Sequence, residues 1–251
     1  MIKILNIPIY QKDYKNVLHE VKESVNNQKK IYICVAATHL IMECQKNIEL
    51  LKGVQNADIV TPDGMPLVWL SKLYGNKKAS RIYGPDLTLM LCKLAQKNKF
   101  NIFLLGGANG QSSNLAKKLR IKYPGLKIVG TEDTPNRPIP KKENDLIIKK
   151  INKIKPDLVF VGLGCPNQEL WMINNRNRIH ASTLIGVGAA FDFITKTVGQ
   201  APKWMQNNGL EWFYRLLQDP KRLWRRYTVL NTLFLLKISK QITKDFLNGK
   251  I

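Results

Sequence analysis

Six short, mainly apolar runs separated by longer amphipathic segments are the feature that most constrains how this chain can fold. The runs are residues 31–37, 59–60, 102–105, 126–129, 158–161 and 184–187. Strands that are apolar along their whole length are buried on both faces, as in a parallel sheet covered by helices. We therefore expect each run to be a strand of one mainly parallel sheet.

The segments between these runs place apolar residues at helical spacing. They are residues 40–51, 66–73, 87–97, 113–123, 144–154 and 168–178. Alternation of strands and helices predicts an α/β fold of the doubly wound, Rossmann-like kind, with helices on both faces of the sheet.

The composition changes at about residue 202. Beyond it no strand pattern occurs, and tryptophan, arginine and lysine gather in residues 204–227. We expect an α/β domain over residues 1–201 and a basic helical appendage over residues 202–251.

The net charge of the chain limits the kinds of partner that it is expected to bind. Forty lysines and arginines face 18 acidic residues, a formal net charge of +22. Such an excess suits an anionic membrane face, phosphorylated ligands or nucleic acid. The aromatic and basic residues 224–227 would suit RNA, although no recognised RNA-binding motif occurs. A solvated lysine-rich surface explains many of the lysines equally well.

Cysteine usage and the termini predict a cytoplasmic protein. The four cysteines are scattered without a C-x-x-C pair, which argues against a zinc ribbon and a disulfide framework. The first residues lack a signal-peptide layout, and no run of about 18 apolar residues occurs.

Five of the expected strands end in glycine or polar turns. These turns are residues 38–39, 61–64, 106–107, 162–164 and 186–188. Ligands of open α/β sheets bind beyond the carboxyl ends of the strands. We therefore expect the five turns to converge on one site.

Asp63 directly follows the second expected strand, in a Pro-Asp-Gly turn. A carboxylate there can accept a proton from a sugar hydroxyl. It can equally cap the helix that follows.

Two further turns suit a nucleotide. Gly106 and Gly107 would let backbone amides approach a phosphate, although a tight turn explains them as well. Gly162 and Gly164 precede Gln168 and Glu169, whose side chains suit a uracil ring or ribose hydroxyls. The alternative is a helix cap in which Glu169 interacts with the helix dipole.

Asp192 is an acid among apolar residues, so it is either paired or functional. The three histidines and the acids show no metal-ligand spacing, and no D-x-D occurs. We therefore expect no metal and no cofactor, with the charge of a leaving diphosphate met by arginine, lysine or helix dipoles.

Together these strings resemble the WecG/TagA/CpsF family, glycosyltransferase family 26. The matching blocks are residues 57–66 with 81–87, 162–171, 186–193, and 201–205 with 209–212 and 215–222. They occur in the family's order and span roughly residues 30–227.

The resemblance implies an inverting, metal-independent transfer. The sugar, N-acetylmannosamine or a related hexose or uronic acid, would pass from a UDP donor to an undecaprenyl-diphosphate-linked sugar. The pathway would be teichoic acid or surface polysaccharide synthesis.

By the same resemblance, Asp63 is the base, and Arg81, Gln168 and Asp192 line the site. Three arginines of the appendage would reach the lipid diphosphate at the inner face of the membrane. They are Arg215, Arg222 and Arg225. Nucleic acid is then not expected as a partner; the rival hypothesis is a non-enzymatic module that binds nucleotide or RNA.

The chain departs from the family pattern at positions that we expect to recognise the sugar. Residues 36–39 are Ala-Ala-Thr-His where many members have Thr-x-Asn, so Thr38 and His39 are assigned to the sugar or acceptor site with the donor sugar left open. Gln200 stands where many members have arginine, and residues 130–133 lack the commoner glycine-aromatic ending.

The last 25 residues repeat apolar side chains at helical spacing among lysines. This helix either lies on an anionic membrane surface or packs on the catalytic domain or on a second subunit, so a homo-oligomer stays open. Residues 203–251 hold ten basic and three acidic side chains, a net charge of +7.

Overall fold

The six predicted strands form one parallel sheet. The computed structural model describes residues 2–135, 137–249 and 251. The strands are β3 (Ile31–Ala36), β4 (Ile59–Pro62), β5 (Asn101–Gly106), β6 (Lys127–Glu132), β7 (Leu158–Gly162) and β8 (Thr183–Gly186). Their order is β4-β3-β8-β7-β5-β6, and all neighbours are parallel. The predicted Rossmann-like α/β class is confirmed.

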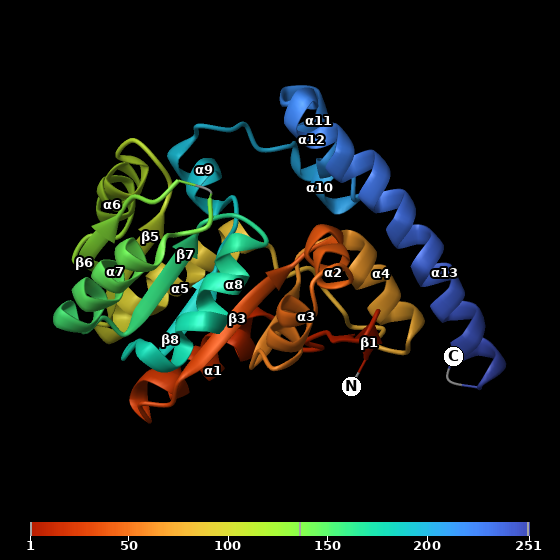
Figure 1. The fold of residues 1–251 in the computed structure, drawn as a ribbon, viewed down its shortest axis with the longest axis horizontal. Coiled ribbons are helices and arrows are strands. Elements are labelled where there is room, and N and C mark those ends of the chain that lie inside the picture. The colour runs from red at the N-terminus through yellow and green to blue at the C-terminus, as the bar shows by residue number, and fades with distance from the viewer. Residues whose placement is uncertain (1, 136, 250) are drawn as a thin grey trace.

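Helices cover both faces of this sheet (Figure 1). They are α1 (Tyr14–Asn26), α2 (Thr38–Cys44), α3 (Ile48–Gln55), α4 (Met65–Leu73), α5 (Gly84–Asn98), α6 (Gln111–Lys122), α7 (Lys141–Ile154), α8 (Asn167–Asn175) and α9 (Ala190–Thr195), with a 3₁₀ turn η1 (Arg176–Arg178) after α8. Successive residues of a strand point to opposite faces. In β5, Ile102 and Leu104 therefore belong to the buried cluster that includes α1, α5 and α6, while Phe103 and Leu105 belong to the cluster on the other face, which includes α2, α3, α7 and α8.

The single helix predicted over residues 40–51 was wrong. It is two helices, α2 and α3, because Asn47 starts a new one: its side-chain oxygen accepts hydrogen bonds from the backbone N–H groups of Glu49 and Leu50. Helix α1 was not predicted at all, although its apolar face is buried on the sheet.

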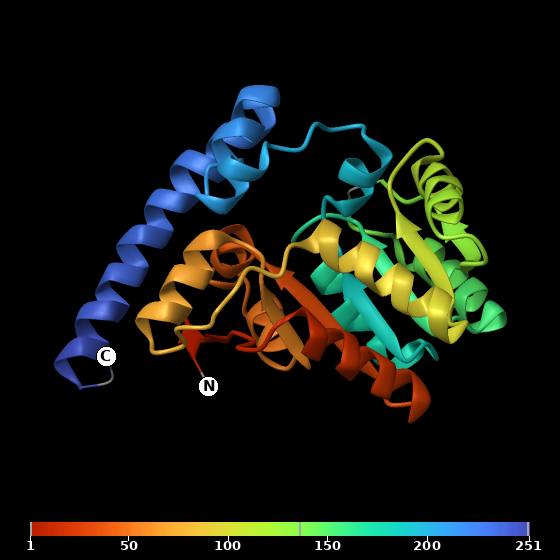
Figure 2. The same ribbon diagram turned by 180° about the vertical axis from the view of Figure 1, so that it is seen from behind.

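The C-terminal helical segment predicted by the change in composition is present. It consists of α10 (Lys203–Asn207), α11 (Glu211–Gln218), α12 (Pro220–Arg225), a π-helical stretch η2 (Arg226–Leu230) and α13 (Asn231–Leu247). Helices α10–α12 lie above the carboxyl ends of the strands, and α13 runs back toward the N-terminus (Figures 1 and 2). There Gln241 accepts a hydrogen bond from the backbone N–H of Leu5, beside the small antiparallel pair β1 (Lys3–Ile4) and β2 (Ile7–Pro8).

Helix α13 has an inner and an outer face. Leu230, which ends η2, and Phe234 and Ile238 of α13 are at most 8% exposed and join the core that covers one face of the sheet. Packing on this domain, one of the two alternatives for the helix, is therefore seen. At 100° per residue, Leu236 lies on the opposite side of the helix and Leu233 lies on its flank, and both side chains are exposed.

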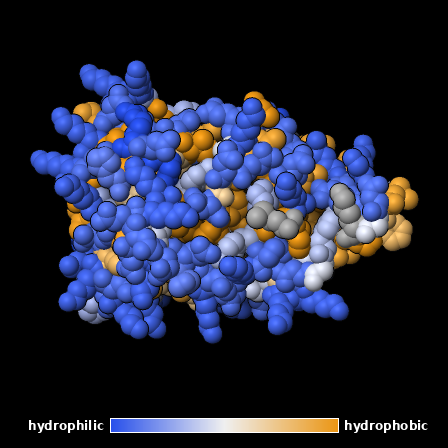
Figure 3. Space-filling view, turned by 90° about the horizontal axis from the view of Figure 1, so that it is seen from below, coloured by the Kyte–Doolittle hydropathy of each residue, from blue (hydrophilic) through white to orange (hydrophobic). Residues whose placement is uncertain are grey.

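The surface on the side of the molecule opposite α10–α12 is mainly polar. Seen from below, it is covered mainly by hydrophilic side chains (Figure 3). Among the described residues, no helix has both the length and the apolar character needed to cross a bilayer.

Candidate functional site

A polar cavity of about 320 Å³ lies at the carboxyl ends of the strands. The turns after β4, β5, β7 and β8 contribute Asp63, Gly107, Gly162, Gly164 and Gly188 to its lining. Four of the turns predicted to converge therefore do so, and the turn after β3 contributes Ala37.

A second cavity, of about 600 Å³, lies between α2 and α4 on one side and the C-terminal helices on the other. Large apolar side chains form much of its lining, among them Met65, Trp69, Trp212, Phe234 and Leu235. No pattern in the sequence analysis indicated this cavity, because its two walls are separated by more than 130 residues.

Asp63 lies where the two cavities meet, since it lines both of them. Its Oδ1 accepts a hydrogen bond of 3.2 Å from the backbone N–H of Gly84, the first residue of α5. It does not cap α4, whose N-cap residue is Gly64. The capping alternative is therefore wrong, and the carboxylate is held at the boundary between the cavities.

The pKa of Asp63 is raised to about 6, chiefly by burial of the carboxyl group. The guanidinium of Arg81, with Nη2 3.6 Å from Oδ1, opposes this rise, and the negative charge of Glu211 adds to it. A carboxylate with such a pKa can take up a proton near neutral pH.

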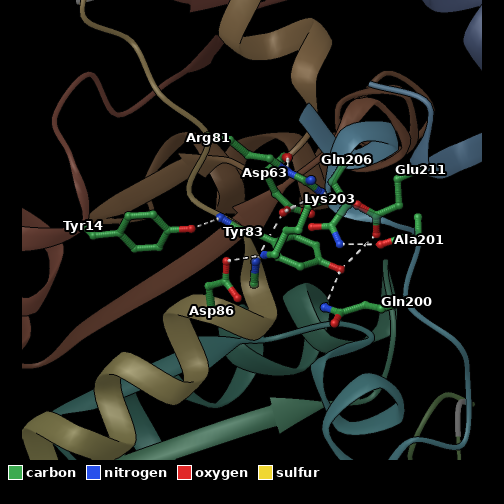
Figure 4. A network of polar contacts seen from close by, with 11 residues as sticks. Tyr14, Asp63, Arg81, Tyr83, Asp86, Gln200, Ala201, Lys203, Gln206 and Glu211 are labelled. Carbon is green, nitrogen blue, oxygen red and sulfur yellow. Dashed lines mark hydrogen bonds and ion pairs between the residues drawn. The ribbon is translucent and has the colours of Figure 1, made fainter. Parts of the chain in front are cut away.

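Glu211, which the sequence analysis did not single out, belongs to the same cluster (Figure 4). Its Oε2 accepts a hydrogen bond of 2.7 Å from Nη2 of Arg81, and its Oε1 accepts one of 3.0 Å from the hydroxyl of Tyr83. Because both carboxylate oxygens are engaged, Glu211 is less suited than Asp63 to act as a base. It also joins the C-terminal helices to the sheet domain.

Two of the residues assigned to the donor do not line the polar cavity. Gly106 packs against β7, and a Cβ atom there would lie 2.5 Å from the backbone of Gly162. Glu169 is fully buried, and its carboxylate accepts a hydrogen bond from the side-chain amide of Gln168, which does line the cavity. Burial raises the pKa of Glu169 to about 7.

Gln168 itself lines the polar cavity, together with Asp192. The side-chain oxygen of Gln168 accepts a hydrogen bond from the backbone N–H of Gly188. Asp192 accepts a hydrogen bond of 2.6 Å from the amide of Gln111, so this acid among apolar residues is both paired and at the cavity wall.

Thr38, His39 and Arg81 line the apolar cavity. The Thr38 hydroxyl donates a hydrogen bond to the side-chain oxygen of Asn231, the first residue of α13. Burial lowers the pKa of His39 to about 3, so the imidazole is neutral near pH 7 and can accept a hydrogen bond without adding charge.

The three arginines assigned to the lipid diphosphate do not lie together. Arg215 and Arg222 line the polar cavity, whereas Arg225 is exposed and lines neither cavity. The next residue, Arg226, does line the cavities: like Arg215, it contributes to the lining of both. The π-helical stretch that begins at Arg226 changes the direction of successive side chains, so sequence position alone did not identify it.

Arg215 and Arg226 have no ion pair among the described residues, and the buried Nε atom of each lacks a hydrogen-bond partner there. Their guanidinium groups instead lie over the rings of Phe193 and Tyr227, at 5.3 and 5.6 Å. Two positive charges without a direct ion pair at the junction suit an anionic ligand such as a diphosphate. No group of three or more His, Cys, Asp or Glu in the described part of the chain could hold a metal ion.

Comparison with known proteins gives a family match and named relatives. The model of the "Glycosyl transferase WecG/TagA/CpsF family" matches residues 2–246. An N-acetylglucosaminyldiphosphoundecaprenol N-acetyl-beta-D-mannosaminyltransferase of Bacillus subtilis (strain 168) is 32% identical over 224 residues, 89% of this chain and 85% of that protein. The enzyme of the same name from Staphylococcus aureus (strain MW2) is 26% identical over 241 residues, 95% of this chain and 92% of that protein.

Proposed function

Because this chain belongs to the WecG/TagA/CpsF family of glycosyl transferases, we propose that it moves N-acetylmannosamine or a related sugar from UDP to a polyprenyl-diphosphate-linked N-acetylglucosamine. The names of its relatives in Bacillus subtilis and Staphylococcus aureus support this choice of sugar and acceptor. The transfer inverts the anomeric centre and needs no metal ion.

The position of Asp63 at the boundary between the two cavities carries this proposal. In an inverting transfer the base and the leaving group lie on opposite faces of the sugar ring. A donor in the polar cavity would present its anomeric carbon to Asp63, and an acceptor in the apolar cavity would present its hydroxyl group from the other side. Asp63 takes the hydroxyl proton as the oxygen forms the new bond and UDP leaves.

The leaving diphosphate needs positive charge in place of a metal ion. Arg215 and Arg222 line the polar cavity and supply that charge. The turns at Gly107 and Gly164, both with positive φ, bring the backbone close to the cavity without a side chain in between. Charge that builds up on the diphosphate in the transition state is therefore met by groups already in place.

The decisive assay uses UDP-N-acetylmannosamine with a water-soluble analogue of the lipid-linked acceptor, and reads the product by mass. We expect one sugar to be added with release of UDP, and the rate to be unchanged by excess EDTA. Loss of the rate on chelation, with rescue by magnesium or manganese, would refute the metal-free mechanism. Absence of the product, with retention of RNA on a filter at physiological salt, would favour the rival nucleic-acid-binding module.

We further propose that the C-terminal helices place the enzyme on the inner face of the cytoplasmic membrane. Of the nineteen large apolar side chains that are exposed in the described residues, twelve lie between Trp204 and Leu247. They accompany the net positive charge of this segment. Apolar side chains beside basic residues bind anionic bilayer surfaces, with about 1 kcal/mol from each basic residue near the surface.

Replacing Leu233 and Leu236 together with glutamine tests this location. Both side chains are exposed, so we expect the variant to keep its fold and its rate on a soluble acceptor while co-sedimentation with anionic vesicles falls about tenfold. The matched control replaces Ile121 of α6 and Leu146 of α7, which are 80% and 62% exposed. Equal sedimentation of both variants would refute the assignment. Deleting the helix is a poorer test, because it removes Leu230, Phe234 and Ile238 from the core.

A further inference from the structure

The apolar cavity has a charged end and an apolar end. The charged end lies where this cavity meets the polar one, because four charged residues line both cavities: Asp63, Glu211, Arg215 and Arg226. Trp69 and Leu235 are at the apolar end and are 50% and 63% exposed. The cavity therefore matches a ligand whose anionic group is joined directly to a hydrocarbon chain.

We propose that this cavity holds the first prenyl units of the acceptor, with the acceptor diphosphate at Arg226, which lines both cavities. The inference rests on the proposed function and adds to it a binding site for the lipid. A volume of about 600 Å³ is within the usual range for small-molecule sites. Such a volume takes the start of a long polyprenyl chain, and the remainder of the chain leaves the protein.

The indole ring of Trp69 forms a wall of this cavity that joins the two parts of the molecule. It packs on Gly209, in the turn between α10 and α11, where a Cβ atom would lie 2.8 Å from the ring. Gly209 also has a φ of +71°, which disfavours other residues. The ring thus reaches from α4 to the turn between α10 and α11.

Leu235 marks the direction in which the chain leaves. On α13 it lies between the buried residue Phe234 and the outward-facing Leu236. Successive residues of a helix are 100° apart, so Leu235 lies at the edge between the side of α13 that lines the cavity and the side that we propose contacts the membrane. A prenyl chain passing Leu235 would continue toward the bilayer.

The lining favours a prenyl chain over other occupants. An extended peptide would need backbone hydrogen-bond partners along its length, which aromatic and aliphatic walls do not supply. A nucleotide would need more polar partners than the region around Trp69, Trp212 and Leu235 offers. A hydrocarbon chain needs only apolar surface, and its burial is favourable in proportion to the area covered.

The test compares two soluble acceptors that carry the same N-acetylglucosamine diphosphate, one on a methyl group and one on a farnesyl chain. Assays contain no vesicles, so that membrane binding plays no part. We expect the wild-type KM for the farnesyl acceptor to be at least about tenfold lower, because several buried carbon groups add to its binding. In Leu235→Gln and Trp69→Ala most of this preference is lost, while the KM for the methyl acceptor changes little.

Leu236→Gln is the matched control, because Leu236 has nearly the same exposure as Leu235 but does not line the cavity. It should keep the full preference. Equal KM values for the two acceptors in the wild type, or an unchanged preference in both cavity variants, would overturn the lipid site while leaving the transfer reaction standing. No transfer to either acceptor would instead overturn the proposed function. Thermal unfolding shows that each variant is folded, and the exposed position of Leu235 makes its variant the safer one.

Discussion

Replacing Asp63 with asparagine is expected to lower kcat for sugar transfer by roughly 100-fold or more, the range typical for loss of a general base. Asparagine keeps the size of the side chain and its oxygen, so the hydrogen bond from the backbone N–H of Gly84 can persist. Binding of UDP, measured by calorimetry, should therefore change little. A variant with near-normal kcat would show that another group accepts the hydroxyl proton.

The pH dependence of the same reaction gives an independent check on Asp63. Its raised pKa of about 6 means that the carboxyl group is protonated below that pH and cannot act as a base. Wild-type kcat/KM should therefore rise with pH through about 6 and then level off, whereas the asparagine variant should lack this rise. Glu211→Gln removes a negative charge that raises the pKa of Asp63, so the rise should move to lower pH. A rise that stays in the Asp63→Asn variant would assign it to another group.

The fold could be predicted from the sequence because its signals are local. Each buried strand is a run of apolar residues, and each run is bounded by a turn, so six strands and their common direction follow from patterns a few residues long. The break between α2 and α3 was missed because one capping side chain, Asn47, outweighs a continuous apolar periodicity. The helical pattern of α13 was visible, but only the structure shows that one side of it packs on the core.

The sequence could place residues that directly follow a strand, because the carboxyl ends of parallel strands share one edge of the sheet. Asp63, Gln168 and Asp192, which the family resemblance assigned to the site, all line the polar cavity, and their roles stay predictions. Which way a neighbouring side chain points does not follow from the sequence: Glu169 turns inward and supports Gln168, and Gly106 packs on β7.

The C-terminal helices pack back against the sheet domain and bring further residues to the site. Their position in the sequence did not indicate that these residues belong there. Glu211 is 130 residues away from its partner Arg81 along the chain, and a single carboxylate in a helix start gives no sign of such a pairing. The apolar cavity has the same origin, since α4 forms one of its walls and α13 another. Its lining became visible only once the two segments were placed together.

The neighbouring residues Arg225 and Arg226 allow a sharp test of which arginines bind the acceptor diphosphate. Arg226→Met is expected to lower kcat/KM by about 100-fold, because it removes a positive charge from the junction of the two cavities, where we place the acceptor diphosphate. Arg225→Met removes the same charge one residue earlier, from an exposed position that lines neither cavity, and should lower kcat/KM by no more than about threefold.

Both changes reduce the net charge of the C-terminal helices equally, so their general attraction to an anionic membrane should weaken to the same extent. A difference between them on a soluble acceptor therefore reports the site alone. Arg226→Lys should recover part of the lost rate, since lysine keeps the charge but cannot donate two parallel hydrogen bonds to a phosphate. Equal losses in Arg225→Met and Arg226→Met, or a larger loss in Arg225→Met, would contradict the assignment. The acceptor diphosphate would then be bound by arginines other than those that line the two cavities.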